Sequence, residues 1–195
     1  MIKRLYVHEN IYDAFIEKFV AFVKTLPVGA GTEENTFIGP VQNSMQYAKA
    51  RDLLSNINAE HLKTVLGAPL TEERKGFFIP PTIVDNPPES SRIVQEEPFA
   101  PILPILKWSD EDDVIARAND TDSALGASVW SPDPIKARRI ADQLAGGSIW
   151  INGHFEVSPI VPFGGHRGSG IGTEWGVQGL TQYCNSQSLW IHGHP

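Results

Sequence analysis

The chain contains, at residues 95–108, the stretch Gln95-Glu96-Glu97-Pro98-Phe99-Ala100-Pro101-Ile102-Leu103-Pro104-Ile105-Leu106-Lys107-Trp108. The run that starts at Ile102 is mostly apolar, which is typical of a buried strand. In the part before it, two carboxylates and an aromatic ring stand among prolines, which favour extended backbone in the residues that precede them. The stretch therefore predicts a junction where one strand ends, another begins, and two carboxylates and a ring converge.

The rest of the chain alternates between helical and strand patterns. Apolar residues recur at helical spacing, which predicts helices at residues 11–26, 44–59, 109–118, 134–144 and 174–183. Short apolar runs predict strands at 3–8, 62–66, 77–84, 102–108, 126–131, 148–152 and 188–192, with a turn at 71–76. Strands joined through helices need crossover connections, so the chain is predicted to be an α/β protein whose mostly parallel sheet is flanked by helices.

Cap residues mark the ends of several predicted helices. Asn10 is the expected N-cap of the first helix, and Pro27 ends that helix. Ser109 and Asp133 are the expected caps of two later helices. No linker or repeat divides the chain, and a chain of this length can bury about 70% of its unfolded surface. One domain with one core is expected over residues 1–185, followed by a C-terminal strand and tail over 186–195.

Composition places the chain among globular proteins, with 41% hydrophobic and 20% charged residues in a length of 195. The formal net charge is −7 and the basic residues are scattered, so no nucleic-acid partner is expected. The apolar run Phe19–Val23 is far shorter than the roughly 20 residues that span a bilayer, so no membrane partner is expected. A single cysteine and the lack of a visible targeting segment favour a reducing compartment, with the cytoplasm as the expected location.

Several motifs together resemble the aldehyde dehydrogenase family. The Glu-Glu-x-Phe pattern at residues 96–99 is similar to that family's E-E-x-F-G-P motif, and residues 162–172 are similar to its P-F-G-G-x-K-x-S-G-x-G run. Further matches, all in the family's order, are Gly39-Pro40, residues 75–82, 118–121 and 147–152. The resemblance covers essentially the whole chain, from Ile2 to Ile191.

The resemblance implies roles for individual residues. Glu97 would bind the nicotinamide ribose of NAD or NADP, because a carboxylate can accept hydrogen bonds from both ribose hydroxyls, and Phe99 would contact the edge of the nicotinamide. Asn152, Val157 and Phe163 would line the aldehyde pocket. The C-terminal strand would join a neighbouring subunit, so a homo-oligomer or an association with another aldehyde dehydrogenase chain is expected.

The same resemblance implies that central parts of the chemistry are missing. Residues 2–8 resemble the strand that follows the family's catalytic cysteine, so the nucleophile, the general-base glutamate and the dinucleotide-binding domain would lie outside this chain. We therefore expect no catalytic residue here: a truncated catalytic domain that binds cofactor poorly by itself and is inactive alone. Two alternatives remain: an interaction module that docks onto a full-length relative or a separate N-terminal half, and a different acid–base chemistry using Glu96, Glu97 and Glu156.

Two other features suggest function less strongly. Residues 168–172 do not complete the dinucleotide fingerprint, because Thr173 stands where its last glycine would be, so a tight turn is favoured over phosphate binding. The family's lysine in this run is Arg167 here. Cys184, the single thiol, has no activating base or cation beside it in sequence and is predicted to be structural.

The histidines in the C-terminal part of the chain do not form a recognised metal motif. His154 and His166 are isolated, and no H-E-x-x-H or paired-cysteine spacing is present. His192 and His194 would give two ligands without a third, which is an incomplete site. No metal site is expected.

Overall fold

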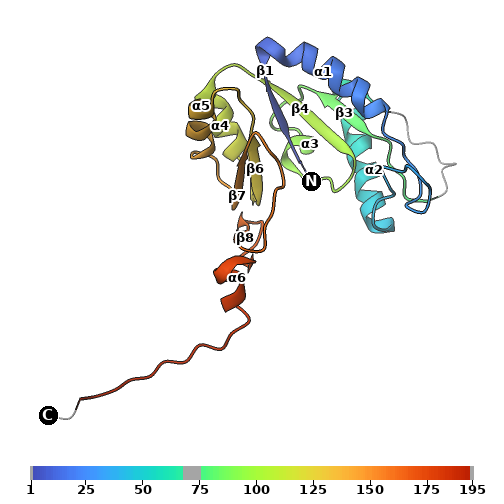
Figure 1. The fold of residues 1–195 in the computed structure, drawn as a ribbon. Helices are drawn as coiled ribbons and strands as arrows, with labels where there is room; N and C mark the ends of the chain where they lie inside the picture. The colour runs from blue at the N-terminus through green and yellow to red at the C-terminus, as the bar shows by residue number, and fades with distance from the viewer. Residues whose placement is uncertain (1, 68–75, 194–195) are drawn as a thin grey trace. The chain divides into compact units, whose positions relative to one another are not determined.

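The computed structural model describes residues 2–67 and 76–193, shown as a ribbon in Figure 1. The chain divides into two compact units, residues 1–110 and 111–195, and each is described by itself. The sequence, which suggests one core over residues 1–185, gives no sign of this boundary. Most of the predicted turn at 71–76, the start of the motif at 75–82, and His194 lie outside the described residues.

A four-stranded sheet forms the centre of the first unit. Its strands lie in the order β1, β4, β3, β2, with bounds Leu5–His8, Ile102–Trp108, Thr82–Asp85 and Thr64–Leu66. The pairs β1–β4 and β4–β3 are parallel, whereas β2 pairs with β3 in the antiparallel direction. The prediction of a mostly parallel sheet is therefore confirmed.

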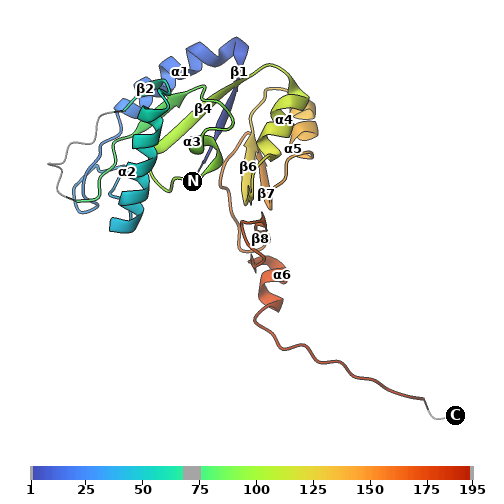
Figure 2. The ribbon, with the colours of Figure 1, turned by 180° about the vertical axis from the view of Figure 1, so that it is seen from behind.

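Helices cover both faces of this sheet (Figure 2). On one face, Ile83 and Ile105 are buried with Tyr12 of α1, which spans Glu9–Lys24. Their neighbours in sequence, Val84 and Leu106, are buried on the other face with α2 (Ser44–Ala59) and α3 (Arg92–Gln95). This alternation follows from the two-residue period of a strand, and it explains why β4 is apolar along both faces.

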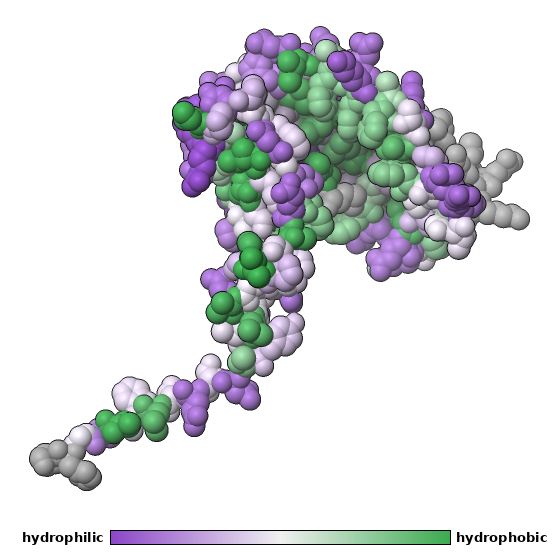
Figure 3. All heavy atoms as spheres, in the orientation of Figure 1, coloured by the Kyte–Doolittle hydropathy of each residue, from purple (hydrophilic) through white to green (hydrophobic). Residues whose placement is uncertain are grey.

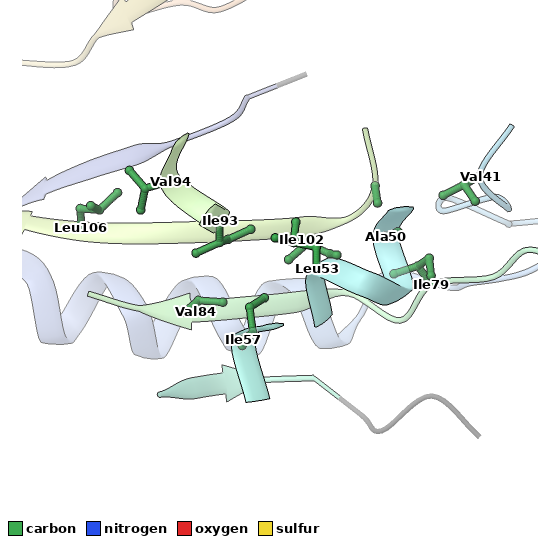
Figure 4. Packing of buried hydrophobic residues seen from close by; sticks show 11 residues of the cluster. Val41, Ala50, Leu53, Ile57, Ile79, Val84, Ile93, Val94, Ile102 and Leu106 are labelled. Atoms are coloured by element: carbon green, nitrogen blue, oxygen red, sulfur yellow. The ribbon is translucent and has the colours of Figure 1, made fainter. Parts of the chain in front are cut away.

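The larger cluster lies between the sheet and α2 and α3 (Figure 4). Leu53 and Ile57 of α2 lie one helical turn apart and are 2% and 1% exposed. Ile93 of α3 and Ile102 of β4 are equally buried. Burial of four such side chains contributes about 1.5–3 kcal/mol each relative to exposure, so this cluster fixes where α3 ends and the following segment begins.

Of the helix caps predicted from sequence, Asp133 is confirmed and Asn10 is wrong. The helix expected to start at the cap Ser109 begins only at Glu111, and the cap of α2 was not predicted. Asn43 caps α2 through a hydrogen bond of 2.9 Å from the Gln46 N–H, and Asp133 caps α5 (Pro134–Ala141). The first helix starts at Glu9, two residues before the predicted start, and its N-cap is His8. The prediction of Asn10 as the cap was therefore wrong, because the His8 ring accepts the hydrogen bond from the Asn10 N–H instead.

The structure also corrects the junction ahead of β4. The residues before Glu97 form the short helix α3, so Glu97 follows a helix and not a strand. Strand β3 begins at Thr82, later than the predicted start at residue 77. Pro80 and Pro81 explain the late start, because proline has no N–H to donate to a neighbouring strand.

Over its described residues, 111–193, the second unit contains short strands and three helices. Strands β6 (Gly126–Val129) and β7 (Ser148–Ile151) form a parallel pair. The helices are α4 (Glu111–Asn119), α5 and α6 (Gly176–Thr181). Antiparallel pairs join β5 (Ser123–Ala124) to β9 (His166–Arg167) and β8 (Phe163–Gly164) to β10 (Thr173–Glu174).

Beyond α6 the chain runs on without helix or strand as far as residue 193 (Figure 1). The strand predicted at 188–192 has no pairing partner among the described residues, and a strand needs one to satisfy its N–H and C=O groups. Leu189, Trp190 and Ile191 are 81%, 83% and 82% exposed, and green hydrophobic atoms mark this extended segment in Figure 3.

No helix within residues 2–67 and 76–193 is both long enough and apolar enough to cross a membrane.

Candidate functional site

The segment Glu96–Phe99 connects α3 to β4 and is held in place from both sides. Pro98 is buried, and its carbonyl accepts a hydrogen bond of 2.6 Å from the side-chain amide of Gln46 in the first turn of α2. Phe99 has a φ of 44°, which is uncommon for a residue other than glycine, and its side chain is 59% exposed. The backbone at Pro98 is thus fixed while the side chains on either side of it point to solvent.

A groove of about 590 Å³ lies along this segment. It is lined by residues of α2, α3 and the segment itself, namely Gln46, Lys49, Asp52, Leu53, Arg92, Glu96, Glu97, Pro98 and Phe99. The structure therefore places the two predicted cofactor residues, Glu97 and Phe99, on one groove. Sequence reasoning missed Gln46 and Lys49, which are three positions apart on α2 and so face the same side of that helix.

The two adjacent carboxylates differ in their partners. Glu96 accepts hydrogen bonds from Arg92 at 2.6 and 3.1 Å, and Arg92 also reaches Asp52 at 3.0 Å. The carboxylates of Glu96 and Asp52 raise the pKa of Arg92 further above its ordinary value. Within the described part of the chain, no hydrogen bond or ion pair engages the Glu97 carboxylate, so Glu97 is the carboxylate available to a ligand.

The ion pair between Glu96 and Arg92 concerns the alternative function, in which Glu96, Glu97 and Glu156 act as acid and base. Glu96 is engaged with Arg92, and neither compact unit contains Glu156 together with Glu96 or Glu97. The Glu156 carbonyl accepts a hydrogen bond of 2.8 Å from the Trp150 indole. The contacts within each unit therefore give the acid–base alternative no support.

The predicted pocket residues lie in the second unit, around the end of β7. Asn152 follows that strand with a φ of 54°, and its side-chain amide pairs with the backbone N–H and C=O of Ser131, both at 2.9 Å. Both polar atoms of Asn152 are thus engaged in joining two chain segments. Val157 is 43% exposed.

Phe163 belongs to a row of aromatic rings. The centroid of its ring lies 6.3 Å from that of Phe155, in an edge-to-face arrangement, and 5.7 Å from that of Trp175. The ring centroid of Phe155 lies 6.3 Å from that of Trp150. The Trp150 ring also contacts His154, with a centroid distance of 5.4 Å. Phe163 is the ring of this row that matches a family motif directly, and Trp150 lies within the matching stretch at residues 147–152, which could have pointed to it.

The glycine-rich run at residues 162–172 is packed tightly against backbone. A Cβ added at Gly147 would lie 1.6 Å from the Gly164 carbonyl oxygen. A Cβ added at Gly164 would lie 2.8 Å from the Gly172 carbonyl oxygen. Gly170 has a φ of 113°, which glycine adopts without strain. These contacts support the tight-turn interpretation of the run.

Arg167, which stands at the family's lysine position, has an internal role. Its guanidinium donates to the carbonyls of Asn119 and Thr121 at 2.5 and 2.7 Å. The motif at residues 118–121 is thereby tied to the glycine-rich run. Two motifs that resemble the family separately in sequence are therefore joined by hydrogen bonds in the folded chain.

Cys184 and the histidines add no further site. The Cys184 thiol is exposed and lies 3.6 Å from the Leu180 carbonyl, to which it donates. Among residues 2–67 and 76–193, no three histidine, cysteine, aspartate or glutamate side chains gather as metal ligands would.

Comparison with known proteins agrees with the motifs. The model of the aldehyde dehydrogenase family matches residues 1–189. The aldehyde dehydrogenase LUC3 of a Fusarium species is 38% identical over 191 residues, which cover 97% of this chain and 40% of that protein.

Solved structures give the same result. An aldehyde dehydrogenase variant from Bacillus cereus matches with a TM-score of 0.90 and 30% identity, covering 97% of this chain and 38% of that one. The betaine aldehyde dehydrogenase of Staphylococcus aureus in complex with NAD+ matches with a TM-score of 0.85 and 34% identity, covering 93% and 37%. The chain spans about 39% of the length of the curated relatives it matches. With a family match over nearly all its residues and the same fold, the chain belongs to the aldehyde dehydrogenase family.

Proposed function

We propose that this chain supplies part of an enzyme that oxidises an aldehyde to a carboxylic acid with NAD or NADP, and that its share is to hold the nicotinamide half of the cofactor. The observation that carries the proposal is the Glu97 carboxylate, which has no hydrogen bond or ion pair among the described residues and lies beside Phe99 on the groove of the first unit. The Staphylococcus aureus relative has NAD+ bound, which supports the choice of cofactor.

The chemistry of the groove suits a nicotinamide riboside. The Glu97 carboxylate can accept hydrogen bonds from the two hydroxyls of one ribose, and charge assistance strengthens both bonds. The exposed Phe99 ring offers an apolar contact next to it. Lys49 adds a positive charge to the same groove, which suits the phosphate attached to that ribose.

The bound cofactor would supply the acceptor for the hydride that leaves the aldehyde. The residues of this chain would bind and orient: Glu97 and Phe99 fix the nicotinamide riboside, and Phe163 with its neighbouring rings and Val157 forms a wall of the aldehyde pocket. Asn152 would hold the end of β7 in place for that wall through its pair of bonds to Ser131.

We propose further that these 195 residues by themselves do not turn over an aldehyde. The reaction needs a thiolate nucleophile and a base, and the single thiol, Cys184, lies exposed with the Leu180 carbonyl as its partner. Purified chain mixed with NAD+ and a panel of aldehydes should show no rise in NADH absorbance. A steady rise that follows the chain's concentration would contradict this.

The cofactor role can be tested with nicotinamide mononucleotide, which contains the nicotinamide, its ribose and one phosphate. In a titration followed by NMR, the side-chain amide of Gln46 and the backbone amide of Phe99 should shift. Glu97→Gln should weaken binding by about tenfold or more, because a hydrogen bond to a charged group contributes about 1.5–3 kcal/mol. Glu17→Gln, an exposed change on α1 with the same loss of charge, should bind as the unaltered chain does. Equal binding by both variants would reject the role of Glu97.

A second function, association with another chain, is favoured by the exposed tail. Leu189, Trp190 and Ile191 are more than four-fifths exposed on an extended segment, which is the form that adds a strand to an open sheet edge. We propose a homo-oligomer, or an assembly with another aldehyde dehydrogenase chain, joined through residues 186–195, and a cytoplasmic location consistent with one free thiol. Light scattering should give a mass that rises with concentration and falls to that of one chain when Trp190→Ser is introduced. A constant single-chain mass would exclude self-association.

A further inference from the structure

Two neighbouring side chains on β6 and β7 both reach the loop that follows β7. Ser128 and Trp150 are paired residues in the register of this parallel sheet. The Ser128 hydroxyl and His154 Nδ1 share a hydrogen bond of 2.7 Å, and the Trp150 indole donates one of 2.8 Å to the Glu156 carbonyl. The loop is therefore fastened at two points, one residue to each side of Phe155.

The fastened residue is held in an unusual conformation. Phe155 has a φ of 57°, which costs free energy for a residue with a Cβ, and its ring is 59% exposed. Its ring also lies 6.4 Å from His154 and meets Phe163 edge to face, with an interplanar angle of 88°. Two hydrogen bonds on the flanking residues and three ring contacts, to Trp150, His154 and Phe163, thus hold an exposed aromatic side chain in place.

The stretch of sequence that carries Trp150, Phe155 and Phe163 has little formal charge. Residues 143–166 contain no lysine or arginine, and Glu156 is their single formal charge. Phe163 pairs across β8 and β10 with Glu174, which adds a second carboxylate nearby. Glu156 and Glu174 would repel a carboxylate group, whereas an aromatic ring can pack against Phe155 and Phe163, which already contact each other in the edge-to-face geometry that aromatic pairs prefer.

We propose that Ser128 and His154 are positioning residues that hold Phe155 opposite Phe163 as a preformed aromatic wall, and that this wall selects aldehydes whose body bears a ring and no negative charge. The inference rests on the proposed function for its assignment of this region to the aldehyde pocket. Preforming the wall lowers the conformational cost of binding, because the loop and the Phe155 side chain are already ordered.

The test uses the whole chain and benzyl alcohol, an unreactive analogue of a ring-bearing aldehyde. The Trp150 indole resonance, assigned by its loss in Trp150→Phe, should shift saturably on titration. Benzoate, which has the same ring with a negative charge, should bind at least about tenfold more weakly. Phe155→Ala should weaken benzyl alcohol binding by about three- to tenfold, while Phe22→Ala, an exposed aromatic change in the first unit, should leave it unaltered.

The positioning role has its own variants. Ser128→Ala should weaken benzyl alcohol binding by about threefold and speed hydrogen exchange at the Trp150 indole. Ser128→Thr, which keeps the hydroxyl, should restore both. Because Ser128 is only half-buried, Ser128→Ala should keep the unfolding midpoint of the unaltered chain, which separates positioning from a general loss of stability.

Two results would overturn the inference: no shift of the Trp150 indole with benzyl alcohol, or equal binding by Ser128→Ala and the unaltered chain. Failure of the proposed function is distinguishable, because nicotinamide mononucleotide reports on the first unit and benzyl alcohol on the second. Loss of the nucleotide response with the ring response intact would reject the cofactor role and keep the aromatic wall. Loss of the benzyl alcohol response with the nucleotide response intact would reject the aromatic wall and keep the cofactor role.

Discussion

The side-chain amide of Gln46 donates a hydrogen bond of 2.6 Å to the carbonyl of Pro98, which stands 52 residues later in the chain. The Gln46 N–H is itself bound to Asn43, so the cap of α2 sets the position of the donor. Pro98 separates Glu97 from Phe99. One bond from the start of a helix therefore fixes the backbone between the two candidate cofactor residues.

Replacing Gln46 by leucine should loosen this segment. The change leaves a buried carbonyl without its donor, which costs about 1–3 kcal/mol. Hydrogen exchange at the amides of Phe99 and Ala100 should become faster by a corresponding factor, while Gln42→Leu, a change at an exposed position just before α2, should not alter it. Unchanged exchange in Gln46→Leu would mean that the core beneath Pro98 is sufficient to hold it.

The pair Tyr12 and Asp85 should make the first unit sensitive to acid. Burial disfavours the ionised form of Asp85, but hydrogen bonds from Lys63 at 2.5 Å and from Tyr12 at 2.7 Å outweigh it and hold the pKa of Asp85 below its usual range. A lowered folded-state pKa gives stability that is present above the unfolded pKa of about 4 and is lost as pH falls through the folded one. The free energy of opening, measured by native-state exchange in β4, should therefore fall below about pH 4.

Asp85→Asn tests that assignment. At neutral pH it should cost about 1–3 kcal/mol, and its opening free energy should change less between pH 5 and 3 than that of the unaltered chain. If the opening free energies of Asp85→Asn and the unaltered chain fell equally between about pH 5 and 3, the acid sensitivity would come from other carboxylates. At the alkaline end the sign reverses: burial and Asp85 raise the pKa of Tyr12, so its contribution is complete below about pH 10 and is lost only as pH rises through the folded value.

Gly147→Ala should disrupt the second unit. The new Cβ would lie 1.6 Å from the Gly164 carbonyl oxygen, so the backbone of β8 must move. Overpacking of this kind costs about 1–3 kcal/mol or more, seen as faster exchange in β7 and β8. Gly172→Ala, with nothing within 4 Å of its Cβ, is the matched control and should exchange like the unaltered chain. Equal behaviour of the two variants would contradict the close approach.

Arg167→Ala should detach the glycine-rich run from residues 119–121. Two charge-assisted bonds to backbone carbonyls are lost, which should cost about 2 kcal/mol, and Arg167→Lys should recover part of this because it keeps one donor. Arg138→Ala, which breaks only an exposed ion pair with Asp142, should cost about 0.5 kcal/mol or less. Thermal unfolding of the three variants measures the differences.

Predictions from sequence succeeded where local pattern determines structure. The bounds of α2 and β4 agree with the predicted ranges, and Asp133 caps its helix as expected, because apolar periodicity and capping act over a few residues. They failed at α3 and at the start of β3. At α3 the burial of Ile93 and Val94 under the sheet stabilises a single helical turn that has no strong local signal.

The sequence by itself determined the family, most of the longer helices and strands, and the identity of Glu97, Phe99 and Phe163 as candidate site residues, because motifs and periodicity are properties of neighbouring positions. The tertiary structure decided which of two adjacent glutamates is available, since Arg92 engages Glu96 and leaves Glu97 unpaired within the described residues. It also decided that Ser128 and Trp150 hold the loop around Phe155. Arg92 reaches Glu96 only because α3 forms, and Ser128 reaches His154 only because β6 pairs with β7, so these hydrogen bonds depend on the folded backbone and not on sequence pattern alone.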